Sequence, residues 1–251
     1  MNPIILIPAR LASTRLPNKP LAMIGGLPMI VQVWRRAVAS KVGEVVVACD
    51  SPAIKDAVEQ AGGRAVLTDP DLPSGSDRID AALRQIDPAG QHDVVVNVQG
   101  DMPLLEPSII ARAAALLDNK LVDIGTLCAP LQPGEMEEAS VVKVVVSGQW
   151  TVDKESKSTR AKLFTRSFSS VVHRPPSTDI FHHIGVYAYQ RDALERFVKL
   201  PPSENEKHEK LEQLRAMDAG MRIDVAVVDV VPLGVDTPQG LEKARAMIES
   251  T

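Results

Sequence analysis

The chain has 251 residues, which suits one α/β domain or a core domain with a modest insert. Its formal net charge of −4 gives no general basic surface for nucleic acid or an anionic membrane. Aromatic residues make up only 3% of it, too few for the stacking platforms of single-stranded nucleic-acid binding. No stretch approaches the roughly 20 apolar residues of a membrane helix. We therefore expect no nucleic-acid or membrane partner, and any anion site must be local.

The two cysteines, Cys49 and Cys128, each sit in an apolar, strand-like stretch. Buried free thiols are the usual state of such residues, and they persist in a reducing compartment. The start of the chain also lacks the basic residues of a signal peptide. We therefore expect a soluble cytoplasmic protein.

The first half of the chain alternates short aliphatic runs with amphipathic segments. Strands are predicted at residues 4–7, 44–48, 65–67 and 94–98, and helices at residues 28–40, 77–86 and 107–117. In a further predicted helix, Asp50-Ser51-Pro52 supplies an N-cap residue and an early helical proline, and Gly62-Gly63 ends the helix. Strands that alternate with helices predict crossover connections and a mostly parallel sheet covered on both faces.

After about residue 120 the pattern becomes richer in strands. They are predicted at residues 122–127, 141–146, 163–169, 183–189 and 223–231, and helices at residues 191–198 and 206–219. A last helix is predicted to begin at Thr237, with Pro238 in its first turn. We expect one domain over residues 1–251, with a strand-rich excursion at about 140–190.

The loop after the first strand carries three cations, Arg10, Arg15 and Lys19, with small residues such as Ser13 between them. It matches neither a Walker A loop nor a GxGxxG turn. Ligand loops lie at the carboxyl ends of parallel strands, and such a loop can offer backbone N–H groups and cationic side chains to phosphates. The alternative is a solvated basic loop. Prolines at positions 8, 17 and 20 make the segment rigid, which favours phosphate binding.

Two aspartates follow predicted strands, Asp101 after Gln99-Gly100 and Asp236 before Thr237. Taken singly, Asp101 is compatible with a simple turn, and Asp236 with a helix cap. Together they offer two carboxylates at strand ends that could share Mg²⁺ with a triphosphate.

Three further motifs have competing interpretations. The segment SGSDR (residues 74–78) opens a helix, whose N-terminus could hold a base or a phosphate or could simply be capped. Asp69-Pro70-Asp71 matches the DxD metal signature of glycosyltransferases, but two acids around a proline arise easily in a turn. His182 and His183 in one strand point to opposite faces, so they cannot readily chelate one metal. One inward histidine that donates to a sugar or a carboxylate fits better.

Six segments occur in the order found in 3-deoxy-manno-octulosonate (KDO) cytidylyltransferases, and the chain resembles that family over residues 4 to about 245. They are IPARLASTRLPNKPL, SGSDR, VVNVQGDMPLL, HHIGVYAY, KLEQLRAMDAG and GVDTPQGLEKAR. The resemblance implies a mostly parallel, Rossmann-like nucleotidyltransferase sheet with a smaller strand-rich insert, and a homodimer. It further implies transfer of CMP from CTP to the anomeric hydroxyl of KDO, with release of pyrophosphate, for lipopolysaccharide biosynthesis.

The resemblance also implies roles for individual residues, with Arg15, Lys19, Asp101 and Asp236 forming the catalytic set. The triphosphate would contact Arg10, Ser13, Arg15 and Lys19, and the cytidine would contact Ser74, Gly75, Asp77 and Arg78. Magnesium would be bound by Asp101 and Asp236. The sugar would contact Arg166, His183, Tyr187, Glu212 and Gln213, with Gln99 between nucleotide and sugar.

Three features depart from the family pattern. Met102 stands where Glu is usual, Asn18 replaces a glycine, and residues 167–181 are shortened and altered. Because the last departure affects the sugar side, transfer of CMP to another acidic sugar, such as a nonulosonate, is an alternative. A non-catalytic nucleotide-binding regulator is a more distant one, since it predicts decay of the charged loop or of the two aspartates, and both are intact.

Overall fold

The computed structural model of the chain describes residues 1–148, 151–153, 156–167 and 178–249. Its residues cluster into two compact units, Met1–Ala111 with Pro232–Thr251 (unit 1) and Arg112–Val231 (unit 2). One domain over residues 1–251 stays a prediction. Within the described ranges, no helix is both long and apolar enough to cross a membrane.

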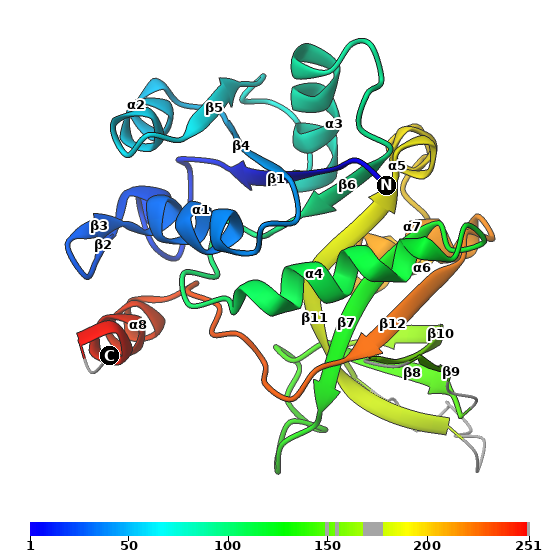
Figure 1. Cartoon of the computed structure of the whole chain (residues 1–251). Helices are drawn as coiled ribbons and strands as arrows, with labels where there is room; N and C mark the ends of the chain where they lie inside the picture. The colour runs from blue at the N-terminus through cyan, green and yellow to red at the C-terminus, as the bar shows by residue number, and fades with distance from the viewer. Residues whose placement is uncertain (149–150, 154–155, 168–177, 250–251) are drawn as a thin grey trace. The chain divides into compact units, whose positions relative to one another are not determined.

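Unit 1 contains a parallel sheet with the strand order β5-β4-β1-β6 (Figure 1). Its strands are β1 (Pro3–Ala9), β4 (Glu44–Cys49), β5 (Arg64–Leu67) and β6 (Val94–Asn97), and its helices are α1 (Met29–Ala39), α2 (Pro52–Gln60), α3 (Gly75–Ile86) and α8 (Pro238–Glu249). A further helix, α4 (Pro107–Ala115), continues into unit 2. The parallel sheet predicted from the alternation of strands and helices is confirmed.

The strands of unit 1 form because their aliphatic runs are buried from both faces. Ile4, Ile5, Leu6 and Ile7 are fully buried in β1, as expected for a strand inside a parallel sheet. Helix α1 buries one stripe that includes Ile30, Val33 and Ala37. The predicted bounds of β1, β4 and α1 agree with the structure to within about two residues, because periodicity and burial indicate the same positions.

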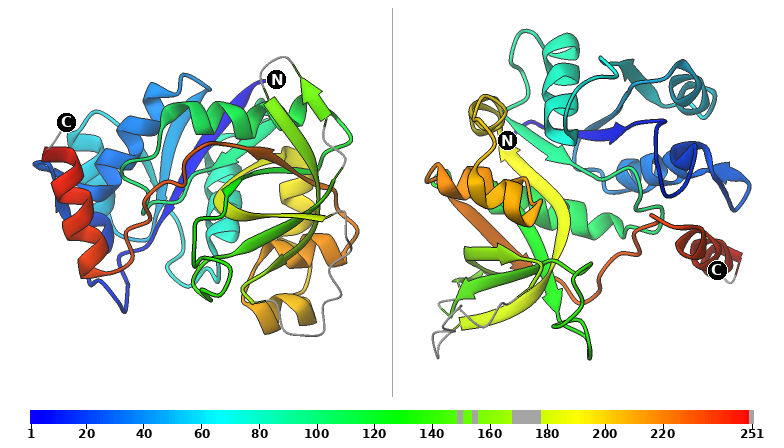
Figure 2. Two further views of the ribbon diagram at one scale, coloured as in Figure 1. Left: turned by 90° about the horizontal axis from the view of Figure 1, so that it is seen from below. Right: turned by 180° about the vertical axis from the view of Figure 1, so that it is seen from behind.

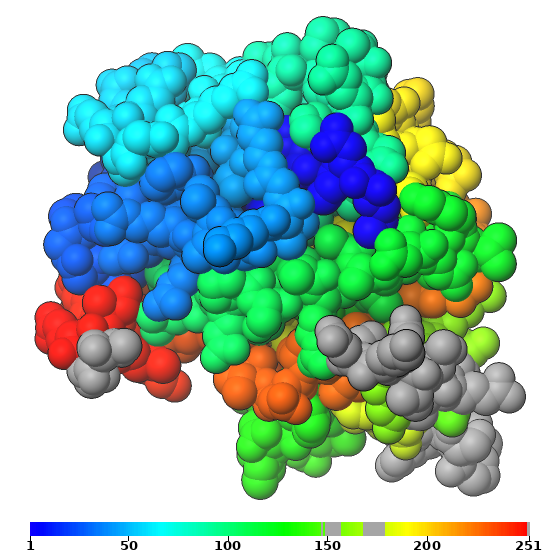
Figure 3. Space-filling model, viewed as in Figure 1, coloured from blue at the N-terminus to red at the C-terminus, as the bar shows by residue number. Residues whose placement is uncertain are grey.

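A small hairpin that the sequence patterns did not predict follows the first loop. It pairs β2 (Met23–Ile24) with β3 (Leu27–Pro28) and comes after a short 3₁₀ helix, η1 (Lys19–Leu21). Its two-residue turn is Gly25-Gly26, with φ of 54° and 77°, a conformation that glycine adopts without strain. Helix α8, from the far end of the chain, packs against β2, so residues near both termini lie side by side (Figure 3).

Unit 2 is built mainly from antiparallel strands. They are β7 (Ile124–Pro130), β8 (Lys143–Ser147), β9 (Thr151–Asp153), β10 (Ser156–Thr165), β11 (Thr178–Gln190) and β12 (Ile223–Val227). Pairing runs β11-β7-β12-β10-β8 and returns from β8 to β11, so these strands close into a ring (Figure 2). The helical elements are η2 (Leu116–Asp118), α5 (Arg191–Phe197), α6 (Glu204–Glu209) and α7 (Gln213–Asp218). The strands β8 to β11 lie in the segment predicted to be rich in strands.

Some predicted bounds in unit 2 are wrong. The single helix at 206–219 is two helices, because Lys210 adopts a left-handed φ of 55° and ends α6. The strand predicted at 163–169 begins earlier and ends at Thr165, and the strand at 223–231 ends at Val227. The altered stretch 167–181 falls largely on residues 168–177, which lie outside the described residues.

Strand β11 contains a bulge near its middle. Ile184 pairs with Leu127 of β7, but the next pair is Tyr187 with Thr126, which leaves two extra residues on β11. A bulge of this kind re-aims neighbouring side chains and is common beside functional sites. It brings the rings of His183 and Tyr187 within 5.5 Å of each other.

Candidate functional site

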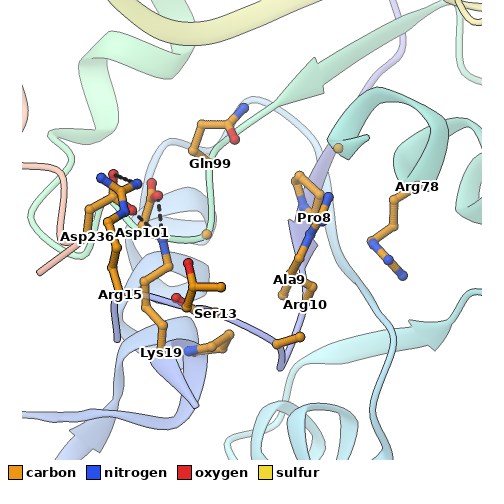
Figure 4. A pocket seen from close by; sticks show the side chains of 15 residues that line it. Pro8, Ala9, Arg10, Ser13, Arg15, Lys19, Arg78, Gln99, Asp101 and Asp236 are labelled. Atoms are coloured by element: carbon orange, nitrogen blue, oxygen red, sulfur yellow. Dashed lines mark hydrogen bonds and ion pairs between the residues drawn. The ribbon is translucent and has the colours of Figure 1, made fainter. Parts of the chain in front are cut away.

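A pocket of about 390 Å³ opens at the carboxyl end of the sheet in unit 1 (Figure 4). Its lining comes from the loop after β1, the start of α3, the segment after β6 and the segment before α8. The lining residues are Pro8, Ala9, Arg10, Ala12, Ser13, Thr14, Arg15, Lys19, Pro20, Gly75, Arg78, Gln99, Gly100, Asp101 and Asp236. The first-loop cations and both aspartates therefore meet in one cavity, although Asp236 lies just before α8 and not directly after a strand as predicted.

Charged side chains converge at one side of this pocket (Figure 4). Lys19 Nζ donates to Asp101 Oδ2 and to Asp236 Oδ1, each at 2.8 Å. The guanidinium of Arg15 lies 3.1 Å from Asp236 Oδ2. Both carboxylates contact one ammonium nitrogen, so they lie close together although they are 82 and 217 residues from Lys19 in the sequence.

This arrangement shifts the pKa values of Lys19 and Asp236. Burial by itself would lower the pKa of Lys19, but Asp101 and Asp236 outweigh it, and the pKa of Lys19 is raised. Burial likewise opposes ionisation of Asp236, yet Lys19 and Arg15 lower the pKa of that carboxyl. Lys19 and Asp236 are therefore charged at neutral pH, and the cluster stabilises their ionised forms.

The backbone before Lys19 explains one departure from the family pattern. Asn18 has φ 55° and ψ 31°, in the left-handed region where glycine and asparagine are the favoured residues. This turn leads directly into η1, whose first residue is Lys19. The replacement of glycine by Asn18 therefore preserves the conformation that directs Lys19 toward the aspartates.

The segment before α8 separates the two roles that were open for Asp236 and Thr237. Thr237 Oγ1 accepts a hydrogen bond from the backbone N–H of Gly240, so Thr237 caps the helix. The carboxylate of Asp236 instead contacts Lys19 and Arg15. The N–H of Val235 donates to the carbonyl oxygen of Asp101 at 2.9 Å, which ties the two aspartate-bearing segments together.

Gly100 lines the pocket, although it was not among the predicted site residues. A Cβ atom at this position would lie 2.9 Å from the carbonyl oxygen of Pro8, closer than a real side chain tolerates. Glycine therefore allows the segment after β6 to approach β1, and Asp101 follows directly. The signal in the sequence was the glycine between a buried strand and an acid.

The start of α3 contributes Gly75 and Arg78 to the pocket, and Arg78 lies on the side away from the aspartates (Figure 4). Arg78 is 1% exposed and donates to Thr68 Oγ1 and to the carbonyl oxygen of Asp69. Burial, together with the positive charge of Arg10, lowers the pKa of Arg78. The cost of burying this guanidinium is offset by hydrogen bonds that hold it at the pocket wall.

Ser74 and Asp77 do not line this pocket in the part of the chain that the structure describes. Ser74 Oγ caps α3 by accepting from the Asp77 N–H, and it also donates to the Asp77 carboxylate at 2.7 Å. In the Asp69-Pro70-Asp71 motif, Asp69 Oδ1 accepts the N–H of Asp71. That bond closes a turn, so the motif has a structural role, as expected for two acids around a proline.

A second polar cluster lies in unit 2, around the bulge of β11. The ring of His183 meets Phe164 edge-on at 4.9 Å and Tyr187 at 5.5 Å. Burial, and to a lesser extent the charge of His182, lower the pKa of His183 to about 3, so its ring is neutral. Burial, with the nearby Tyr189 and Glu212, raises the pKa of Tyr187. Both rings therefore act as neutral hydrogen-bonding groups.

The start of α7 adds Glu212 and Gln213 to this unit. Gln213 is 6% exposed, and its Nε2 has no hydrogen-bond partner among the described residues. A buried amide without a partner costs roughly 1–3 kcal/mol, so such groups occur mainly where a water or a ligand satisfies them. This observation is compatible with a polar ligand at the cluster.

Arg166 is held by backbone and carboxylate groups at the end of β10. Its backbone N–H donates to Glu209 Oε2 at 2.9 Å, and its side-chain Nε donates to the Glu209 carbonyl oxygen at 3.2 Å. The carbonyl oxygen of Arg166 accepts from Lys143 Nζ at 2.8 Å. Lys143 is fully buried, and burial lowers its pKa. These bonds make the position of Arg166 well defined.

His182 and His183 have separate surroundings, as the strand alternation predicts. His182 Nδ1 lies 3.1 Å from Glu135 Oε2, whereas His183 Nε2 contacts Thr126 Oγ1 at 3.0 Å. In the described part of the chain, no group of three or more His, Cys, Asp or Glu side chains is arranged to hold a metal. The pair of Asp101 and Asp236, which substrate oxygens would complete, has only two such side chains and is not a group of that size.

Comparison with known proteins identifies the family. The family model described as "Cytidylyltransferase" matches residues 4–223. A 3-deoxy-manno-octulosonate cytidylyltransferase of Methylobacterium sp. (strain 4-46) is 58% identical over 248 residues, which cover 98% of this chain and 97% of that protein. The chain belongs to the 3-deoxy-manno-octulosonate cytidylyltransferases. A family member from Parvibaculum lavamentivorans is 55% identical, over 98% of this chain and 93% of the relative.

Solved structures agree with membership of this cytidylyltransferase family. A structure described as CMP:2-keto-3-deoxy-manno-octonic acid synthetase complexed with CTP has a TM-score of 0.86 and 37% identity, and covers 100% of this chain and 99% of its own. A cytidylyltransferase from Leptospira borgpetersenii has a TM-score of 0.63 at 18% identity, covering 100% of this chain and 88% of its own, and shows the fold alone. The predicted nucleotidyltransferase fold is therefore confirmed.

Proposed function

We propose that this chain transfers CMP from CTP to the anomeric hydroxyl of KDO, giving CMP-KDO and pyrophosphate. The observation that carries the proposal is the convergence of Arg15, Lys19, Asp101 and Asp236 in one pocket. A solvated basic loop would not hold a partly buried ammonium between two carboxylates. The names of the relatives and the CTP in the solved structure support the choice of nucleotide and sugar.

In the proposed reaction, the chain's cations act on the triphosphate. Arg10, Arg15 and Lys19 lie along a loop rich in small residues, where their charges and backbone N–H groups can receive phosphate oxygens. Arg15 and Lys19 stabilise the negative charge that develops on the departing pyrophosphate. Ser13 and Arg78 complete the phosphate and cytidine side, with Gln99 at the pocket wall.

The two aspartates fit a magnesium ion. Asp101 Oδ2 and Asp236 Oδ1 both lie 2.8 Å from the ammonium nitrogen of Lys19, so they already share one cation. Carboxylate oxygens combined with substrate phosphate oxygens are the donors that Mg²⁺ prefers. When bound, Mg²⁺ would neutralise phosphate charge and polarise the attacking hydroxyl. Asp101 and Asp236 would hold it, and their separation in the chain makes the site dependent on the folded state.

The sugar is assigned to the cluster in unit 2. His183, Tyr187 and Gln213 are neutral polar groups suited to hydroxyls, and the guanidinium of Arg166, which is positioned by the carbonyl oxygen of Glu209, is suited to the sugar's carboxylate. Glu212 adds an acceptor beside Tyr187. The curated relatives favour KDO over a nonulosonate as the acceptor.

The proposal includes three properties beyond the reaction itself. We propose a homodimer that works in the cytoplasm and supplies lipopolysaccharide biosynthesis. The reducing environment of the cytoplasm is supported by Cys49 and Cys128, which are both free and buried. Sedimentation at several protein concentrations measures the oligomeric state. A monomer at all of these concentrations would overturn the proposed homodimer.

Pyrophosphate release tests the proposed function. The protein with CTP, Mg²⁺ and KDO should release pyrophosphate, and omission of KDO should abolish the release. Parallel reactions replace KDO by a nonulosonate, and CTP by ATP, GTP or UTP. Equal rates with the nonulosonate would overturn the choice of sugar, and no release with any acidic sugar would overturn the proposed function.

A further inference from the structure

Thr126 of β7 is fully buried, and its hydroxyl has three neighbours that can form hydrogen bonds with it. Thr126 Oγ1 lies 2.8 Å from the carbonyl oxygen of Val186 and 3.1 Å from that of Ile184. It also lies 3.0 Å from His183 Nε2. Both carbonyls belong to the bulge of β11, where the regular pairing with β7 is interrupted.

The proton of this hydroxyl can go to one neighbour only. A carbonyl oxygen accepts and never donates, so the hydroxyl proton must lie toward Val186 or Ile184. If it pointed to His183 instead, two buried oxygen–oxygen contacts of 2.8 and 3.1 Å would have no hydrogen between them. Thr126 Oγ1 therefore accepts from His183, and the imidazole proton is on Nε2.

The other nitrogen of the ring must then carry a lone pair. Burial keeps His183 neutral, so it has one N–H, and that N–H is used by Thr126. No described residue makes a hydrogen bond with His183 Nδ1. The aromatic rings of Phe164 and Tyr187 pack against the imidazole and limit its rotation. This tautomer would make His183 an acceptor toward a ligand, whereas the sequence led us to expect an inward histidine that donates.

We propose that Thr126 is a positioning residue that fixes His183 as the Nε2–H tautomer, so that His183 Nδ1 accepts a hydrogen bond from a hydroxyl of the sugar. The sugar half of this inference rests on the proposed function. A bare ring nitrogen can accept from a hydroxyl but repels a carboxylate, which only accepts. His183 thus selects a hydroxyl-bearing carbon of the acceptor, and the carboxylate must be bound by a cation.

Nitrogen-15 NMR of the histidine-labelled full chain tests the tautomer directly. The spectrum of the unmodified protein should show a protonated Nε2 and an unprotonated Nδ1 for His183, assigned by the loss of its signals in His183→Gln. Addition of KDO alone should shift the Nδ1 signal more than the Nε2 signal. A protonated Nδ1, or an Nδ1 signal that saturating KDO leaves in place, would overturn the inference.

Two substitutions of Thr126 separate positioning from packing. Thr126→Val keeps the shape but removes the acceptor, so the KM for KDO should rise about tenfold, which corresponds to about 1.4 kcal/mol. The KM for CTP should stay unchanged. The matched control Thr126→Ser keeps the hydroxyl and should restore both the tautomer and the KM for KDO. A folded Thr126→Val protein with the unmodified KM for KDO would overturn the inference.

These measurements separate the inference from the proposed function. If the unmodified protein releases no pyrophosphate with CTP and KDO, the proposed function fails and the sugar half fails with it. The tautomer in that case is still decided by the spectrum of the unmodified protein. If pyrophosphate is released but His183 carries its proton on Nδ1, the inference alone fails.

Discussion

Replacement of Asp101 by asparagine removes one negative charge from the pocket and changes little else. Asn has nearly the volume of Asp, and its amide oxygen can still accept the hydrogen bond that Lys19 Nζ now donates to Asp101 Oδ2 at 2.8 Å. Lys19 also keeps its second partner, Asp236. The substitution therefore isolates the effect of the charge from that of packing.

The expected magnitudes for stability and catalysis differ widely. The side chains of Lys19 and Asp101 are 18% and 26% exposed, and the loss of such a partly screened pair costs about 1 kcal/mol of the free energy of unfolding. A protein stabilised by about 5–15 kcal/mol stays folded after that loss. The loss of a preorganised charge at the reacting phosphates should lower turnover about 10²–10³-fold. Unfolding cannot explain a decrease of that size.

The assay measures pyrophosphate release from CTP and KDO at saturating Mg²⁺, beside urea unfolding of the same samples. The matched control is Asp71→Asn, which removes a carboxylate of the Asp69-Pro70-Asp71 turn, outside the pocket. It should leave turnover unchanged, whereas a metal-binding DxD motif would require the opposite. Near-unmodified turnover of Asp101→Asn would refute the role given to that carboxylate.

Three further predictions use other parts of the structure. Lys19→Met should lower turnover about 10²–10³-fold in the same assay, while Arg35→Met, on the exposed face of α1, should have no effect; equal losses would contradict the role of Lys19. Asn18→Gly should change the free energy of unfolding by less than about 1 kcal/mol in urea titrations, whereas Asn18→Val should cost more, because a β-branched residue resists φ of 55°. Arg215 lowers the pKa of Glu206, so this ion pair stabilises the fold above the unfolded-state pKa of about 4.5, and its contribution is lost as pH falls through the folded-state pKa. Glu206→Gln should therefore flatten the pH dependence of the unfolding free energy below pH 5. An unchanged pH dependence in that range would contradict this.

Sequence patterns correctly predicted the elements in which the local signals all indicate the same structure. Strand β1 and helix α1 have continuous or periodic apolar residues, and their bounds were close to those observed. The break between α6 and α7 was missed because Lys210 is not a residue whose left-handed conformation can be foreseen. The β2–β3 hairpin was missed because its strands have two residues each, too few for any periodicity.

The candidate site was predictable to a different degree in each unit. In unit 1, the charged residue types identified the pocket, because cations and acids at strand ends have few structural uses other than binding. The caps at Ser74 and Thr237 show the limit, since a cap and a ligand contact have the same sequence signature. In unit 2, the partner of His183 could not be predicted, because the bulge that brings Thr126 to it leaves no mark in the sequence beyond Gly185.

The two aspartates illustrate why the fold must precede the chemistry. Asp101 lies in the segment after β6 and Asp236 in the segment before α8, and a backbone hydrogen bond from the Val235 N–H to the Asp101 carbonyl oxygen joins the two segments. Leu16 and Val235 pack in one apolar cluster with Leu241 of α8, so the loop, the last segment and the last helix share a core. Substitutions in that cluster should therefore weaken the pairing of Lys19 with Asp236 before they affect β1, whose residues are not members of the cluster. Packing of the last helix thus helps to bring Asp236 to the pocket, where it meets the charges of the first loop.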